Sequence, residues 1–265
     1  MLWEELTAQE FDSCVEKSEG LCVLPIGVLE KHGNHLPLGT DMYIVRGIAE
    51  AAAEASPTVV FPYYYLGQIA EARHVKGTIA ASHKLMMDAL LEMCDEIHRN
   101  GFTKILILSG HGGNSHFLPY FAQMYPGIKR DYALYTHFVH DLTDEDYEEI
   151  KKRTETDDLG KHAGFSETAL IMHLRPDLVK MDTVDIEESI SLGRLDEIKE
   201  VRVFTGYNWY ADYPNHIAGD PSLATADKGK IIFDMACSKV EKILQVIKND
   251  KNSHKLIEEY NKKAF

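Results

Sequence analysis

The residues best suited to chemistry follow an apolar run, in the stretch Leu24 to Asp41 (LPIGVLEKHGNHLPLGTD). Glu30, His32 and Asp41 offer carboxylate oxygens and imidazole nitrogens, which are common ligands of catalytic divalent metal ions. Glu30 and His32 are two residues apart, so their side chains would leave an extended chain on one face. The glycines and proline between His32 and Asp41 favour turns that would return Asp41 to the same place.

Two further segments carry residues of the same kind. His111 follows the apolar run Lys104 to Leu108, and His162 and Glu167 lie in the segment HAGFSET. A single histidine beside an apolar run is more often structural, but three such segments in one chain predict a shared site. Glutamate, aspartate and histidine without cysteine favour a hydrolytic ion such as Zn²⁺ or Mn²⁺, with one position open to water.

Other residues are candidates for contact with a substrate. Gly112 and Gly113 offer backbone N–H groups at the start of a helix, which suits an oxyanion, although a tight turn would need the same glycines. Thr78 lies on a loop that we expect either at the pocket or at the surface, and His35 is either a support for a ligand or a turn residue. Three other histidines are interpreted as structural: His116, His137 and His173.

Alternating strands and helices must position these residues. We expect strands at 21–29, 58–64, 104–108 and 132–139. We expect helices from Thr7 to before Gly20, Asp41 to Ser56, Ser82 to Asn100, after Gly113, from HAGFSET to Arg175, and from Thr225 to Asn249. This order predicts one domain, residues 1–265, with a three-layer α/β/α fold, a mostly parallel sheet and its site beyond the carboxyl ends of the strands.

Three segments fall outside this pattern. The acidic segment 141–158 is interpreted as a surface excursion, the segment 180–209 has little periodicity, and the polar tail after Asn249 is expected to be partly disordered.

The composition excludes several classes of partner. Lysine and arginine number 28 against 42 acidic residues, a net charge of -14 that argues against nucleic acids and anionic membranes. Four cysteines without a CxxC pair favour free thiols in a reducing compartment. The N-terminus is acidic and lacks a signal-peptide core, and no apolar stretch has the length of a membrane span. We therefore expect a cytoplasmic protein that acts on a small molecule.

Four segments resemble, in order, the signature segments of the creatininase (creatinine amidohydrolase) family: LPIGVLEKHGNHLPLGTD, SGHGGN, HAGFSET and GDPSLATADKG. The resemblance implies a three-layer α/β fold, a binuclear Zn²⁺ or Mn²⁺ centre with Fe²⁺ as a further candidate, and commonly a homohexamer. It also implies hydrolysis of non-peptide C–N bonds. By motif, Glu30, Asp41 and His111 would hold one ion, His32 and the bridging Asp41 the other, and His162 would handle protons.

The chain departs from creatininase itself at two positions. A glutamate that completes the second metal there is replaced by Gly113, and Glu167, which matches a recurring glutamate of the wider family, is the candidate replacement. A tryptophan that stands four residues before the catalytic histidine is replaced by Asp158. The second change predicts a substrate other than creatinine, with Asp158 beside it.

The sequence thus predicts a metal-dependent hydrolase of an amide, cyclic amide or formamide bond in a small polar substrate, with His162 and Glu167 as catalytic residues. The substrate would lie near Thr78, Gly112, Gly113 and Asp158. Two alternatives stay open. One is hydrolysis of a lactone, cyclic keto-sugar or keto-inositol, and the other is a binding protein on a decayed hydrolase scaffold.

Overall fold

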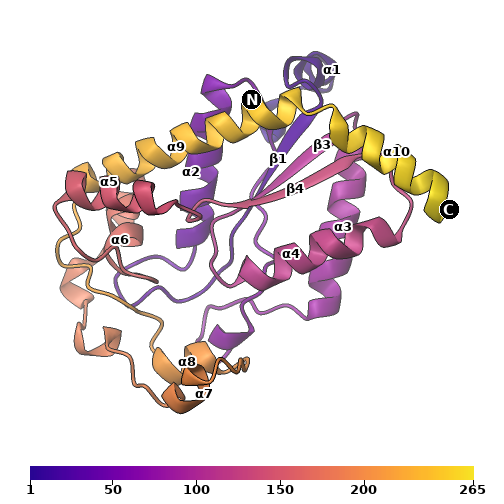
Figure 1. Cartoon of the computed structure of the whole chain (residues 1–265). Coiled ribbons are helices and arrows are strands. Elements are labelled where there is room, and N and C mark those ends of the chain that lie inside the picture. Colours follow the sequence, from indigo (N-terminus) through magenta and orange to yellow (C-terminus); the bar gives the residue numbers. More distant parts are fainter.

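A four-stranded parallel sheet forms the centre of the molecule in the computed structural model, which describes residues 1–265 (Figure 1). The strands are β1 (Leu21–Ile26), β2 (Val59–Val60), β3 (Lys104–Ser109) and β4 (Ala133–Phe138), in the spatial order β2-β1-β3-β4. Every residue of β1 and β3 is buried, as expected for the inner strands of a sheet covered on both faces.

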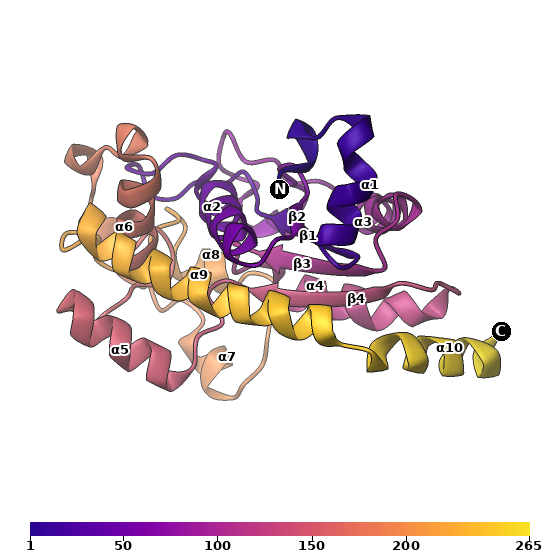
Figure 2. The ribbon, with the colours of Figure 1, turned by 90° about the horizontal axis from the view of Figure 1, so that it is seen from above.

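Helices cover both faces of this sheet (Figure 2). Side chains of β1 alternate between two cores: Leu21 and Val23 lie in one, and Cys22, Leu24 and Ile26 lie in the other. The first core includes residues of α2 (Thr40–Ala55), α6 (Phe165–Leu174) and α9 (Ala226–Asn249). The second includes residues of α1 (Ala8–Lys17), α3 (His83–Arg99) and α4 (Asn114–Met124). The predicted three-layer α/β fold is confirmed.

Local capping signals explain why several helices begin where the sequence predicts. Thr7 and Glu10 form a capping box at α1. The Ser82 hydroxyl accepts the N–H of Leu85 at the start of α3, and the Thr225 hydroxyl does the same for Lys228 at α9.

The strands predicted at 21–29 and 58–64 are both shorter in the structure. β1 ends at Ile26, and the N–H of the next residue, Gly27, donates to the carbonyl of Tyr64. β2 has only two residues, and Tyr64 continues the pairing as a single bridge to Ile26.

Two polar segments are more regular than predicted. The acidic excursion contains α5 (Asp144–Thr154), which begins with a capping box and buries Ile150. The expectation of a disordered tail was wrong, since α10 (Asn252–Ala264) forms there. Asp250 accepts the N–H groups of Asn252 and Ser253, and the Asn261 amide donates to the carbonyl of Arg130. These bonds start the helix and attach it to the body.

The segment without periodicity contains only short elements. The helices α7 (Asp196–Glu200) and α8 (Asn208–Asp212) lie beyond one edge of the sheet in Figure 1. Single 3₁₀ turns complete the chain at Trp3–Glu5, Ala70–Ala72, Tyr125–Gly127, Pro176–Leu178, Met181–Thr183 and Glu187–Ser189. None of the helices combines the length and the apolar content that a membrane crossing requires.

Candidate metal centre

Polar residues gather beyond the carboxyl ends of the strands. Glu30 follows β1, Gln68 and Glu71 follow β2, His111 follows β3 and His140 follows β4. All five line one cavity of about 470 Å³. Parallel strands therefore bring residues from four separate loops to one edge of the sheet, where open α/β proteins form their sites.

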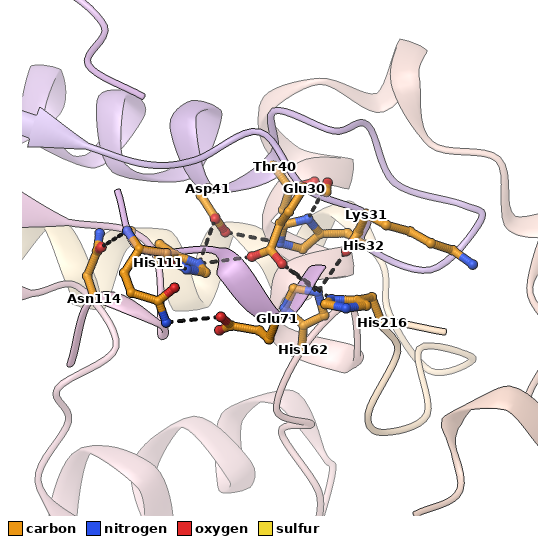
Figure 3. Close-up of polar contacts among 12 residues, drawn as sticks. Glu30, Lys31, His32, Thr40, Asp41, Glu71, His111, Asn114, His162 and His216 are labelled. Atoms are coloured by element: carbon orange, nitrogen blue, oxygen red, sulfur yellow. Dashed lines mark hydrogen bonds and ion pairs between the residues drawn. The ribbon is translucent and has the colours of Figure 1, made fainter. Parts of the chain in front are cut away.

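The five residues predicted as metal ligands meet in a buried cluster, most of which is visible in Figure 3. Their exposed fractions are 8% or less: Glu30, His32, Asp41, His111 and Glu167. Asp41 lies between two histidines, with its Oδ1 3.0 Å from His32 Nε2 and its Oδ2 3.0 Å from His111 Nδ1. Glu30 Oε1 is 2.9 Å from His111 Nδ1, and Glu167 Oε2 is 3.7 Å from His32 Nε2.

Asp41 reaches this place because α2 rests directly on the end of β3. A Cβ atom at Gly110 would lie 2.6 Å from the carbonyl oxygen of Asp41 and 2.8 Å from Cβ of Val45. Any other residue at position 110 would force the helix and the strand apart. The first turn of α2 can approach the cluster because this position is glycine.

Three histidines use one ring nitrogen each to bind a backbone carbonyl. His111 donates its Nε2–H to Gln68 at 2.7 Å, His162 donates its Nε2–H to Lys31 at 2.9 Å, and His32 donates its Nδ1–H to Glu30 at 3.3 Å. These bonds leave the second nitrogen of each ring available to a proton or a metal ion. The second nitrogens of His32 and His111 face carboxylates. The bond from the first nitrogen to a backbone carbonyl is of the kind that usually orients a metal-binding histidine.

The two carboxylate oxygens that face His111 lack hydrogen-bond partners. Glu30 Oε1 and Asp41 Oδ2 are buried and have no hydrogen bond, although His111 Nδ1 lies within 3.0 Å of both. Lone pairs that face one another in a buried site are unfavourable unless a cation lies between them. The donor set therefore fits divalent metal.

Three groups of donor atoms lie within 4.8 Å of one another, and each could hold an ion. They are Glu30 with Asp41 and His111, His32 with Asp41 and Glu167, and Glu30 with His32 and His162. The first two groups share Asp41 and divide its two oxygens. This arrangement suits a pair of ions joined by one carboxylate.

The pKa shifts in the cluster also indicate that its donor atoms attract positive charge. Burial alone would raise the pKa of Glu30, but His162 and His111 outweigh burial and lower it well below its usual range. Burial lowers the pKa of His32, but the carboxylates of Asp41 and Glu167 outweigh it and raise this pKa to about 10. The carboxylates thus draw positive charge into the site, as protons when no metal is bound.

The structure gives a reason for the missing glutamate at Gly113. A Cβ atom there would collide with the His111 ring and would lie 2.9 Å from the carbonyl oxygen of Gln68. Glu167, in the first turn of α6, brings a carboxylate to His32 from another element. Its Oε2 also accepts the N–H of Ala163 at 2.6 Å, which fixes the side chain.

The residues predicted near the substrate divide into two groups. Gly112 and Gly113 line the cavity, and neither donates its N–H to a backbone carbonyl. Thr78 and Asp158 are not among the lining residues. The Thr78 hydroxyl is buried without a partner, and the exposed Asp158 accepts the N–H of Gly160 at 2.8 Å.

His35 is buried beside the cluster, and its Nε2 lies 2.9 Å from the hydroxyl of Thr168. Burial, with a smaller effect of His32, lowers the pKa of His35 to about 4. A neutral His35 therefore joins the first ligand loop to α6, the helix that carries Glu167.

Sequence patterns missed several residues that line the cavity. His116, interpreted as structural, lines it and packs against Phe204, with ring centroids 5.4 Å apart. Other missed residues occur without a motif, among them Glu71, His140 and Lys161. His216, from the segment before the GDPSLATADKG motif, is fully buried against Glu30. Only its closeness in sequence to that motif could have indicated it.

Comparisons with known proteins agree with this architecture. A sequence model of the family described as "Creatininase: Creatinine amidohydrolase" matches residues 4–244. The "Creatinine amidohydrolase" of Pseudomonas putida is 27% identical over 198 residues, covering 68% of this chain and 74% of that protein. The "3-dehydro-scyllo-inosose hydrolase" of Thermotoga maritima is 24% identical over 248 residues, covering 86% and 77%.

Solved structures of creatininase share the fold. A mutant creatininase of the Zn-Zn type matches with a TM-score of 0.77 and 21% identity, covering 94% of this chain and 98% of that chain. The structure named "Creatininase Mn" matches with a TM-score of 0.77 and 22% identity, covering 94% and 99%.

Proposed function

Since the chain belongs to the creatininase family, we propose that it is a metal-dependent hydrolase of a non-peptide C–N bond. The bond would be an amide, cyclic amide or formamide in a small polar substrate. The observation that carries the proposal is the buried cluster in which imidazole nitrogens face carboxylate oxygens, two of which have no hydrogen bond. Such a cluster is balanced by divalent cations.

The proposed ligands form two sets. Glu30, Asp41 and His111 would hold one ion, and His32, Asp41 and Glu167 would hold the other. Two divalent ions would supply polarisation of the substrate carbonyl and a water of lowered pKa. The likeness to creatininases of Zn-Zn and Mn types supports Zn²⁺ or Mn²⁺, with Fe²⁺ as a further candidate.

His162 is the proposed proton carrier. Its Nε2–H is held by the carbonyl of Lys31, so the bare Nδ1 lies on the side of Glu167, 4.0 Å from Oε2. Burial, followed by the charge of His32, lowers the pKa of His162, which favours a neutral ring that can accept a proton. Its Nδ1 would take a proton from the attacking water and return it to the leaving nitrogen.

Gly112 and Gly113 are proposed to bind the oxygen that becomes negative during the reaction. Their N–H groups have no backbone acceptor, and they immediately precede α4 at the wall of the cavity. The positive end of the helix dipole adds to the attraction for an oxyanion.

A second candidate function is hydrolysis of a lactone or of a cyclic keto-sugar or keto-inositol. The cavity favours it because several lining side chains can bind hydroxyl groups, among them Glu71, Ser115 and Asn208. The Asn208 Oδ1 atom is buried and has no partner. The similar protein of Thermotoga maritima is named as a hydrolase of 3-dehydro-scyllo-inosose, which is a keto-inositol. The same ions and the same His162 would serve either reaction.

Metal content and activity test the proposal together. The purified protein is expected to bind about two divalent ions per chain and to hydrolyse a member of a panel of amides, cyclic amides, formamides, lactones and keto-inositols. Asp41→Asn removes the shared carboxylate, so both the metal content and the activity should fall. Asp227→Asn changes an exposed aspartate of α9 and should retain the ions. A correctly folded native protein that binds no Zn²⁺ or Mn²⁺ in titration would overturn the proposal.

A further inference from the structure

His216 lies beside the metal centre without belonging to either proposed ligand set. Figure 3 shows its ring next to Glu30 and His162. The residue is 0% exposed, and its Nδ1 is 3.4 Å from Glu30 Oε2. Neither of its ring nitrogens has a hydrogen-bond partner. A fully buried imidazole with no partner on either nitrogen requires a physical explanation.

This placement has an energetic cost. A buried polar atom without a hydrogen bond costs roughly 1–3 kcal/mol. The backbone of His216 is left-handed, with φ of 54°, and such a conformation costs about 1–2 kcal/mol for residues with a Cβ. Two costs at one residue are typical of functional sites. The backbone does have a structural role, because its carbonyl accepts the N–H of Gly33 at 2.6 Å. That bond would form with any side chain at position 216.

The two oxygens of Glu30 have different surroundings. Oε1 faces His111 Nδ1 at 2.9 Å, toward the proposed first ion. Oε2 has two imidazole nitrogens nearby, His216 Nδ1 at 3.4 Å and His162 Nε2 at 3.8 Å. The hydrogen on His162 Nε2 is already donated to the carbonyl of Lys31. His216 is therefore the imidazole that has a hydrogen to offer to Oε2.

We propose that His216 is a positioning residue that donates its Nδ1–H to Glu30 Oε2 and thereby holds Oε1 toward the ion shared with Asp41 and His111. The separation of 3.4 Å is slightly longer than a typical N–H···O hydrogen bond. Such bonds are often long in ligand-free sites and shorten in the bound state. The inference rests on the proposed function, because it assigns the ring a role in binding one of the two ions.

Neighbouring rings keep the imidazole in this orientation. The ring centroid of His216 lies 5.8 Å from that of His162, in an edge-to-face arrangement. The rings of His74 and Trp209 lie at 5.5 and 6.2 Å. Packing thus fixes the ring plane, and the hydrogen bond to Glu30 would use that fixed direction. Residues that orient a metal ligand in this way typically contribute a factor of about 10–100 to metal affinity.

Zn²⁺ titration of three variants tests the inference, with a chromophoric chelator as competitor. His216→Asn keeps an N–H close to the position of Nδ1 and tolerates a left-handed backbone. His216→Phe keeps a ring and removes the donor. His216→Gly removes the donor and also relieves the strain of the left-handed backbone. We expect the Phe and Gly variants to bind one of the two ions about 10–100-fold more weakly and the other unchanged. The Asn variant should stay within roughly threefold of the native protein.

The outcomes separate this inference from the proposed function. If the native protein binds no Zn²⁺, both the proposed function and the role of His216 are overturned. Native protein that binds two ions, with the Gly variant equally tight, would overturn the role of His216 alone. An Asn variant as weak as the Phe variant would also overturn it, because shape and not the donor would then matter. Urea unfolding of the metal-free variants shows that each one is folded before titration. If the Phe variant does not fold, the comparison of Gly with Asn decides.

Discussion

At the scale of residues, the candidate metal centre is defined by contacts between individual side-chain atoms. Each oxygen of Asp41 faces a different imidazole nitrogen, and each of those rings has its other nitrogen bound to a backbone carbonyl. Because the backbone fixes both rings, the carboxylate of Asp41 has few alternative positions. Substitutions at this scale should therefore change metal stoichiometry before they change the fold.

Glu167→Gln is expected to release one ion and retain the other. The glutamate contributes to the group with His32 and Asp41 but not to the group with Glu30 and His111. An amide oxygen is a weaker ligand than a carboxylate, so elemental content should fall from about two ions per chain to about one. Activity should fall by a factor on the order of 10². Glu71→Gln, a matched change in the same cavity, should retain both ions, and equal metal loss in the two variants would contradict the assignment.

Metal affinity is expected to rise with pH. In the metal-free site, burial lowers the pKa of His32, but Asp41 and Glu167 raise it to about 10, so the ring is protonated at neutral pH. A metal ion must displace this proton, and its affinity should increase about tenfold per pH unit for each proton released. The increase should continue toward pH 10 and then level off. Calorimetry at pH 7, 8 and 9 measures the metal affinity, and its repetition in buffers of different ionisation heat measures the number of protons released. Equal dissociation constants across this range would exclude proton displacement.

The type of each ligand could be predicted from sequence, but the residues around the ligands could not. Glu30, His32 and Asp41 occur in one specific segment after an apolar strand, and His111 follows another. His216 and Glu71 enter the site from loops whose local sequence has no apolar period, so no periodicity predicts where their side chains lie. His116, interpreted as structural because it lies in a predicted helix, also lines the cavity.

At the scale of elements, the contact between α2 and the end of β3 positions Asp41. Gly110→Ala would place a Cβ atom 2.6 Å from the carbonyl oxygen of Asp41. The helix must then shift, at a cost of about 1–3 kcal/mol. We expect a lower urea midpoint and weaker binding of both ions, since both groups include Asp41. Gly127→Ala is the control, because a Cβ atom there meets nothing within 4 Å. Similar loss in the two variants would show that the contact at Gly110 is unimportant.

The sequence predicted those helices whose start is marked by a local capping residue. It failed for elements whose boundaries depend on tertiary contacts. The boundaries of α1, α3 and α9 follow from capping residues that act over three positions. Of the strand expected at 58–64, only Val59–Val60 is regular, and beyond it the pairing with β1 continues as a single bridge between Tyr64 and Ile26. The polar helix α10 depends on the cap from Asp250 and on the bond from Asn261 to Arg130, which no periodicity indicates.

At the scale of the whole molecule, a homohexamer remains a prediction from family resemblance. Several large apolar side chains between residues 186 and 210 are exposed, including Val201, Phe204 and Tyr207 at 68%, 70% and 72%. Surfaces of this kind are often covered by a partner. Light scattering is expected to give about 180 kDa, six times the chain mass of 30.0 kDa. A mass near 30.0 kDa would rule out stable assembly.

The metal centre should also stabilise the whole fold, because it connects segments that are distant in sequence. Its donors come from the loops after β1 and β3 and from the first turns of α2 and α6. Each ion present at 100 times its dissociation constant would add about 2.7 kcal/mol to the free energy of unfolding. For a chain of this size that corresponds to a thermal midpoint roughly 5–11 °C higher. Calorimetry before and after chelation, and again after Zn²⁺ is restored, measures the shift. Asp41→Asn should show almost none, because its ligand groups are incomplete with or without chelator. A native protein whose midpoint does not respond to chelation would mean that the segments around the sheet edge are held together without ions.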